Sequence, residues 1–200
     1  GTSDTSITPS ASGSATPETL PLGIEKAEEA KKNGKPVHVV IFQDFNCHHC
    51  RDFEQANYET IKKLVEDGSI TVEYRNMIIL DRGSPTQYSA RTANAAYAVA
   101  NQVSADKYLE FQKELFDRQG GGDLNNQQIA DIAAKYGANI SSDLNDNKWR
   151  PLVNVVNEES LNNGVHGTPA IYADGEQFPG PKSEDFPKWV QGKIDAKKQQ

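Results

Sequence analysis

Cys47 and Cys50 are the only cysteines in this 200-residue chain, and two histidines fill the gap between them. The pair directly follows a β-branched run at 37–42, which predicts a buried strand. Beyond the pair, apolar residues recur every three or four positions to about residue 66, which predicts an amphipathic helix. A cysteine pair at this junction restricts the chain to folds in which a buried strand runs directly into a helix.

The start of the predicted helix should give the two cysteines different chemistry. Asn46 is a candidate N-cap, so we expect Cys47 in the first helical turn and Cys50 one turn further along the same side. Free backbone N–H groups and the helix dipole favour a thiolate there. A neighbouring imidazole can stabilise the thiolate further, and His49 is the first candidate for this role and His48 the second. Cysteines in such settings have pKa values of about 3.5 to 7.5, compared with about 8.5 for a free thiol. A stable thiolate makes the disulfide easy to reduce, so the pair is predicted to be an oxidant.

Two other uses of the cysteine pair remain open. Two Cys and two His are the ligands of a structural zinc site, but such sites draw their ligands from two separated segments. A structural disulfide is the second alternative, although closing so short a loop gains little chain entropy, roughly 2 kcal/mol or less. We therefore favour redox chemistry, with no metal and no cofactor, because the cysteines themselves carry the electrons.

The composition excludes several classes of protein. A net charge of −7 argues against a nucleic-acid-binding protein, which would usually show a basic face. No apolar run approaches the ~18 residues of a membrane span. No Met precedes Gly1 and no signal peptide is visible, so we expect that a native N-terminal segment has been removed. The absence of a signal therefore does not indicate a cytosolic protein.

The chain is expected to contain a leader and one domain. Residues 1–20 contain five Ser, five Thr and two Pro with almost nothing apolar, a composition that cannot bury enough surface to fold. We assign residues 1–22 to a flexible leader and residues 23–200 to a single domain. Helical periodicity between residues 84 and 163 predicts a helical insertion of four helices within that domain.

The remaining elements follow from local signals. Good helix formers predict a first helix over 24–33, and a second strand is predicted over 69–80. A strand over 169–173 and a turn at Asp174-Gly175 predict a hairpin, followed by a last helix with Ser183 as its cap. The two early strands flank a helix and should be parallel, and the late pair should be antiparallel.

Two motifs together resemble the DsbA-like branch of the thioredoxin superfamily. The segment FQDFNCHHCRDF (42–53) is similar to the family's F-x-D-F-x-C-x-x-C segment, and GVHGTPAIYADG (164–175) is similar to its later G-V-x-G-T-P stretch. The predicted helical block between them is similar to the helical insertion of that branch. The Ser/Thr/Pro-rich leader makes the chain most similar to the surface-anchored DsbA and MdbA-type oxidases of Gram-positive bacteria.

The resemblance implies a fold, an activity and site residues. The fold is an α/β, thioredoxin-like fold with the insertion between the second strand and the cis-Pro strand, and the activity is thiol–disulfide exchange. Cys47 is implied to be the nucleophile and Cys50 the resolving thiol. Pro169 is implied to be cis and to pack against the disulfide, which would expose the backbone of Thr168 for pairing with an extended substrate. His166, two residues before Thr168, is expected at the rim of this site.

The expected partners are unfolded exported proteins with free thiols and an unidentified protein that reoxidises the cysteine pair. We expect a monomer outside the cytoplasm, anchored at the cell surface through the removed segment. A disulfide reductase or isomerase is an alternative, because Thr168 is also found before the cis-Pro of such relatives. His48 departs from the Pro that many relatives carry after the first cysteine. A non-catalytic thioredoxin-like binding or metal-carrying module is the third alternative.

The proton-relay group is the least determined part of the predicted site. Many members of the superfamily carry a buried acid six residues before the nucleophile, where this chain has Ile41. Asp44 and Glu73 are the two candidates to replace it, although most such carboxylates are solvated surface groups.

Overall fold

The computed structural model describes residues 35–200. The predicted leader (1–22) and the helix predicted over 24–33 lie outside the described residues.

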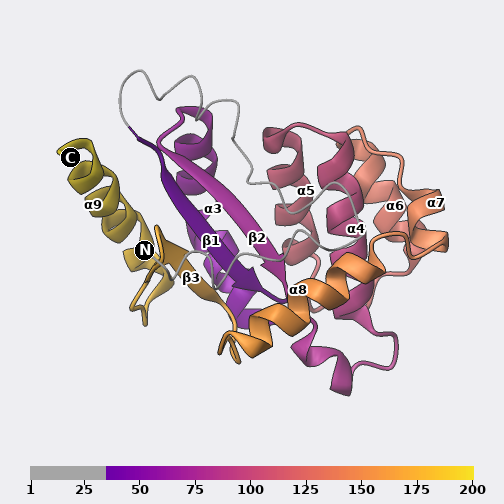
Figure 1. The fold of residues 1–200 in the computed structure, drawn as a ribbon. Coiled ribbons are helices and arrows are strands. Elements are labelled where there is room, and N and C mark those ends of the chain that lie inside the picture. The colour runs from indigo at the N-terminus through magenta and orange to yellow at the C-terminus, as the bar shows by residue number, and fades with distance from the viewer. Residues whose placement is uncertain (1–34) are drawn as a thin grey trace.

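Strand β1 (Val37–Gln43) lies in the middle of the sheet, and its two neighbours run in opposite directions to each other. It pairs in parallel with β2 (Ile70–Asn76) and antiparallel with β3 (Ala170–Ala173), which in turn pairs antiparallel with β4 (Glu176–Gln177). The strand order among the described residues is β2-β1-β3-β4 (Figure 1). The predicted directions of the early and late strand pairs are confirmed.

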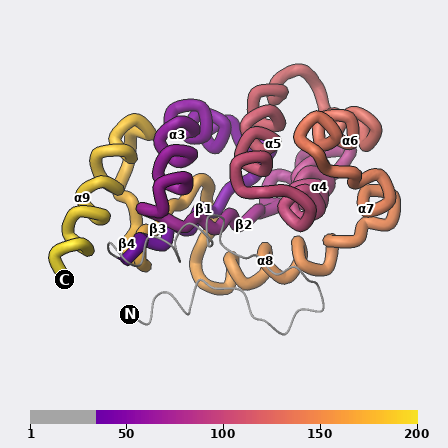
Figure 2. The backbone as a smooth tube through the Cα atoms, turned by 90° about the horizontal axis from the view of Figure 1, so that it is seen from above, coloured from indigo at the N-terminus to yellow at the C-terminus, as the bar shows by residue number. Residues whose placement is uncertain are grey.

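Both faces of β1 are buried, as the β-branched run predicted. Val39 and Ile41 belong to the main core, whereas Val40 and Phe42 belong to a second, smaller cluster. Successive side chains of a strand point to opposite faces, so covering both faces of the sheet buries the apolar residues of β1 and leaves only His38 half-buried. Figure 2 shows the cover: α3 (His48–Glu66) and α8 (Arg150–Asn162) lie on opposite sides of the sheet.

The predicted insertion between β2 and β3 is present as a block of helices beside the sheet (Figure 1). Its members are α4 (Tyr88–Gln102), α5 (Ala105–Asp117), α6 (Asn126–Lys135), α7 (Ser141–Asn145) and α8. The four helices expected from periodicity correspond to α4, α5, α6 and α8. Helix α7 was not predicted, because it is too short to repeat an apolar period.

Two predicted boundaries were wrong. The second strand ends at Asn76 instead of continuing to residue 80, because the backbone turns away from the sheet there. The N–H of Ile78 donates to Oδ1 of Asn157 on α8, at 3.0 Å, and the 3-10 helix η1 (Ile79–Gly83) follows. At the C-terminal end, Ser183 begins a separate 3-10 turn, η2 (Ser183–Asp185), and does not cap the last helix.

The C-terminal elements otherwise follow the prediction. Asp174 and Gly175 have φ angles of 47° and 82°, the left-handed pair that a two-residue hairpin turn requires. Helix α9 (Phe186–Lys198) carries Pro187 in its first turn. Phe186 packs its ring against Phe53 of α3 at 5.2 Å between centroids, so α9 covers the same side of the sheet as α3.

Candidate active site

A tight turn joins β1 to α3 and sets the position of the first cysteine. We call residues 44–47 the cysteine loop. The N–H of Asn46 donates to Oδ1 of Asp44 at 2.9 Å, and the N–H of Cys47 donates to the Asp44 carbonyl at 3.0 Å. The helix consequently begins at His48 with Cys47 as its N-cap residue, in an extended conformation. The prediction of Asn46 as N-cap was wrong by one residue.

The Asp44 side chain fixes this loop to the insertion. Oδ1 also accepts a hydrogen bond from the Ser89 hydroxyl of α4 at 2.6 Å, and Oδ2 accepts the N–H of Leu80 in η1 at 3.1 Å. Burial raises the pKa of the Asp44 carboxyl above its usual value, and these three donors act in the opposite direction. The other acid considered from the sequence, Glu73, is bound to Arg75 within the sheet.

Cys47 and Cys50 are both free thiols, and both are buried. The pKa of Cys47 is lowered to about 5, chiefly by its hydrogen bond with the Cys50 side chain. The Thr168 side chain and the backbone N–H groups of Cys50 and His49 also lower it, whereas burial acts against them. These N–H groups are the unpaired donors at the start of α3, so the helix end stabilises the thiolate as the sequence analysis expected.

Cys50 has the opposite character. Burial raises its pKa far above the usual value for a thiol, and the neighbouring Cys47 sulfur acts in the same direction. Near neutral pH the reduced pair is therefore one thiolate and one thiol. In thiol–disulfide exchange a thiol of lower pKa leaves faster, so Cys47 is the better leaving sulfur of the two.

The Thr168–Pro169 segment lies directly against the first cysteine. The Sγ atom of Cys47 lies 3.7 Å from the Thr168 carbonyl oxygen. The peptide bond between Thr168 and Pro169 is cis in this structure, and both residues are half-buried. The two motifs found in the sequence, 121 residues apart from Cys47 to Thr168, therefore meet at one site.

The three histidines predicted near the site are all exposed. The rings of His48 and His49 lie 4.1 Å apart between centroids on the first turn of α3. His49 lowers the pKa of Cys47 through its backbone N–H. His166 lies in the segment that leads to Thr168, before β3.

Gln119, which was not among the predicted site residues, contacts the cysteine loop. Its Nε2 atom donates to the carbonyl oxygens of Phe45 and Cys47, at 2.8 and 3.0 Å. Gln119 follows the C-terminal end of α5, more than 70 residues beyond the loop. No local sequence signal marks it, because the contact depends on how the insertion folds back onto the loop.

Within residues 35–200, no three His, Cys, Asp or Glu side chains are grouped so as to hold a metal ion. None of the helices in the same residues combines the length and apolar character needed to cross a bilayer.

A sheet of this topology, with a Cys-x-x-Cys pair at the start of its crossover helix and a proline segment beside it, defines the thioredoxin-like class of proteins. The family model described as thioredoxin matches residues 31–192, so the chain belongs to the thioredoxin family. The predicted fold class and the predicted resemblance are both confirmed. No curated protein sequence matches the chain.

Solved structures place the chain beside disulfide oxidoreductases. It is similar to reduced DsbA from Mycobacterium tuberculosis, with 27% identity and a TM-score of 0.69, over 80% of this chain and 82% of that one. For the reduced disulfide bond oxidoreductase DsbG of the same organism, the identity is 26% and the TM-score 0.68, over 80% and 77% of the two chains. The thiol–disulfide oxidoreductase MdbA from Corynebacterium matruchotii shares the fold at 21% identity and a TM-score of 0.67, over 83% and 98%.

Proposed function

We propose that the chain is a thiol–disulfide oxidoreductase that works as an oxidase and introduces disulfides into exported proteins through the Cys47–Cys50 pair. The observation that supports this most directly is the lowered pKa of Cys47, about 5, next to a Cys50 that stays protonated. The similarity to DsbA and DsbG supports the class of reaction.

The lowered pKa of Cys47 favours electron flow from client thiols to the cysteine pair. At pH 7, ionisation stabilises the reduced state of a thiol with a pKa of about 5. This stabilisation is roughly a hundredfold larger than for a thiol with a pKa of about 8.5. The disulfide contains no thiolate and gains nothing from these contacts. The reduced form is therefore favoured by about the same factor, which corresponds to roughly 60 mV in reduction potential. The protein should accept electrons from client thiols.

The proposed reaction has two exchange steps. A client thiolate attacks Sγ of Cys47, the Cys47–Cys50 bond breaks, and Cys50 leaves and takes up a proton. A second client thiolate then attacks the client sulfur of the mixed disulfide and releases Cys47 as a thiolate. The client loses two electrons and forms one disulfide, and the cysteine pair gains those two electrons. A separate partner must remove them again.

The residues around the pair have proposed roles in binding the client. The half-buried Thr168 and Pro169 flank Cys47, so an extended client segment that reaches its sulfur would pass the Thr168 backbone. The exposed His166 would contact the client at the rim. The exposed imidazoles of His48 and His49 would add positive charge near the thiolate when protonated.

The reduction potential tests the proposal. The measurement equilibrates the full chain in glutathione buffers and quantifies the oxidised fraction. An oxidase should lie nearer to the value of DsbA, about −120 mV, than to that of thioredoxin, about −270 mV. A value below about −250 mV would exclude the oxidase and favour the reductase.

The place of action and the partners form a second part of the proposal. We infer a site outside the cytoplasm, where client proteins acquire disulfides, with the Ser/Thr/Pro-rich residues 1–22 acting as a spacer from an anchor. The test is whether the native protein, fractionated from its cells, is recovered with the envelope. Recovery in the cytosol would contradict this part alone.

A further inference from the structure

We propose that Gln119 is a positioning residue for Cys47: its side-chain amide, supplied by the helical insertion, holds the backbone of the cysteine loop in the orientation that thiol chemistry needs. The inference rests on the proposed function and adds a role for the insertion in it. Both amide hydrogens of Gln119 are directed to the loop, one to the Phe45 carbonyl at 2.8 Å and the other to the Cys47 carbonyl at 3.0 Å.

The two acceptors lie on either side of Asn46, and the second belongs to Cys47, the residue directly before the helix. The Cys47 carbonyl also accepts the N–H of Arg51 at 3.1 Å, the first hydrogen bond of α3. Gln119 therefore binds the point at which loop becomes helix. The loop is held from its other side by Asp44, whose carboxylate binds Ser89 and Leu80. The insertion thus contacts the loop from two helices, through Ser89 on α4 and through Gln119 after α5.

Gln119 is itself supported by the end of α5. Its N–H donates to the Phe116 carbonyl at 3.1 Å, which continues the last turn of the helix. Asp117, two residues before Gln119, accepts a hydrogen bond from Gln55 of α3 at 3.0 Å. A side chain positions its target well only when its own backbone is fixed, so these contacts make Gln119 suited to the task.

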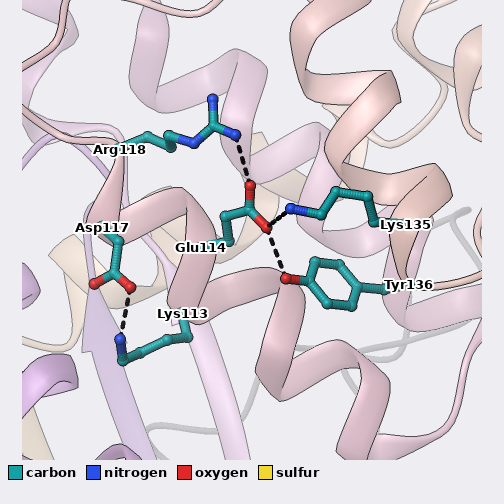
Figure 3. Close-up of polar contacts among 6 residues, drawn as sticks. All are labelled: Lys113, Glu114, Asp117, Arg118, Lys135 and Tyr136. Carbon is teal, nitrogen blue, oxygen red and sulfur yellow. Dashed lines mark hydrogen bonds and ion pairs between the residues drawn. The ribbon is translucent and has the colours of Figure 1, made fainter.

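An ion cluster that joins α5 to α6 adds to this support (Figure 3). Glu114 accepts hydrogen bonds from Arg118 at 2.8 Å, from Lys135 at 2.6 Å and from the hydroxyl of Tyr136 at 2.7 Å. Lys135 and Tyr136 come from the end of α6, so the cluster joins the last turns of α5 and α6. The backbone that carries Gln119 is therefore connected both to α6 and to the redox helix α3.

Holding the loop backbone has a chemical consequence. The backbone of Cys47, with φ −89° and ψ 122°, determines where its Sγ atom lies relative to the first N–H groups of α3 and to Thr168. Those groups are the ones that lower the pKa of Cys47. If the Cys47 peptide rotates when Gln119 is lost, the sulfur moves away from several of its donors together.

The alternative is that Gln119 only braces the fold. Gln102 provides the matched control, because it also bridges two backbone groups from the insertion: it donates to the Asn139 carbonyl at 2.8 Å and accepts the Asn139 N–H at 2.9 Å. That bridge joins α4 to the loop after α6. A bracing role would make the two glutamines equivalent in every redox measurement.

The experiment compares the full chain with Gln119→Ala, Gln119→Glu and Gln102→Ala. The readouts are the glutathione equilibrium constant and the Cys47 pKa, followed by thiolate absorbance. Gln119→Ala should shift the equilibrium about 3- to 10-fold toward the disulfide, or about 15 to 30 mV, and raise the pKa by about 0.5 to 1. Gln119→Glu keeps the size of the side chain but removes both donors, so its shift should be at least as large. Gln102→Ala should stay within about twofold of wild type.

The outcomes separate this inference from the proposed function. Equilibrium constants and pKa values at wild-type level in both Gln119 variants, with a melting temperature lowered as in Gln102→Ala, would overturn the positioning role. A wild-type potential near that of thioredoxin would instead reject the oxidase, while the pKa comparison between variants would still decide the role of Gln119. Because Gln119 is partly exposed, both variants should fold, and circular dichroism checks this.

Discussion

The Sγ atom of Cys47 lies 3.7 Å from the carbonyl oxygen of Thr168, so the nucleophile candidate and the proline segment form one surface. The contact results from sheet pairing, because β3 runs antiparallel to β1 with Ala170 opposite Phe42. Each strand end therefore delivers one of the two motifs to the same edge of the sheet. Changes in one motif should consequently be measurable in the chemistry of the other.

Thr168→Val should raise the pKa of Cys47. Valine keeps the branched shape but lacks the hydroxyl, and the Thr168 side chain is one of the groups that lower this pKa. We expect a rise of about 0.5 to 1 unit, equivalent to one weak hydrogen bond. The measurement is the pH dependence of thiolate absorbance. Thr71→Val, which removes a hydroxyl bound to His38 elsewhere on the sheet, should leave the Cys47 pKa unchanged. Equal shifts in both variants would contradict the assignment.

Cys50→Ala and Cys47→Ala should fail in different ways. Cys47→Ala should lose all oxidation of a reduced test protein, because the attacked sulfur is gone. Cys50→Ala, with its Cys47 first converted to a mixed disulfide by oxidised glutathione, should exchange the glutathione for a client thiol and accumulate client mixed disulfides, which mass spectrometry detects. The Cys47 pKa should also rise in Cys50→Ala, because the hydrogen bond with Cys50 is the largest contribution that lowers it. Activity in Cys47→Ala, or an unchanged Cys47 pKa in Cys50→Ala, would show that the roles are assigned wrongly.

The sequence was informative where a residue's environment is local. The apolar run of β1 and the period of α3 predicted the junction, and the motif resemblance then linked Cys47 to Thr168 across the insertion. Asn46 looked like a cap because its residue type suits one. The structure instead uses Asp44 to bind the Asn46 N–H, which delays the helix by one residue. Asp44 and Asn46 are both residue types that suit a cap, so the sequence alone does not determine at which residue α3 begins.

Long-range polar contacts were not predictable from the chain. Gln119 reaches the cysteine loop only because α5 ends beside α3, and that arrangement depends on packing throughout the insertion. Asp44 was recognised as a candidate acid, but its partners Leu80 and Ser89 belong to segments whose positions no local pattern fixes. The sequence thus identified the sulfur chemistry and missed the groups that hold it in place.

Asp44→Ala should destabilise the protein strongly. The substitution leaves the buried Ser89 hydroxyl and the partly buried N–H groups of Asn46 and Leu80 without their acceptor. At roughly 1 to 3 kcal/mol for each buried unpaired group, a loss of about 3 kcal/mol or more in unfolding free energy is expected. Urea denaturation of the reduced protein measures it.

Asp67→Ala is the control for this loss. Asp67 also accepts a backbone N–H two residues ahead, from Ser69 at 2.9 Å, but it does so at the exposed end of α3. Its loss should cost less than about 1 kcal/mol, because water replaces the missing acceptor. Similar losses in the two variants would mean that Asp44 is an ordinary turn residue and not the anchor of the cysteine loop.

The stability difference between reduced and oxidised protein should depend on pH. The folded-state pKa of Cys47, about 5, lies below the value of about 8.5 for an unfolded thiol. Because the folded-state pKa is depressed, the Cys47 thiolate contributes its full share to the free energy of unfolding of the reduced form above pH ~8.5. This contribution declines below that pH and is lost as the pH falls through ~5. At pH 7 it amounts to about 2–3 kcal/mol. The oxidised form, which has no thiolate, lacks this contribution.

Melting curves of both redox forms at pH 8 and pH 5 test this dependence. The reduced form should melt at the higher temperature at pH 8, and its advantage should shrink at pH 5. Comparing two redox forms of one chain at each pH cancels the titration of every group whose pKa is the same in both forms. A gap that is the same at both pH values would show that the Cys47 thiolate does not stabilise the reduced fold. An oxidised form that melts higher at pH 8 would point to a reductase, because its disulfide would then be the more stable state.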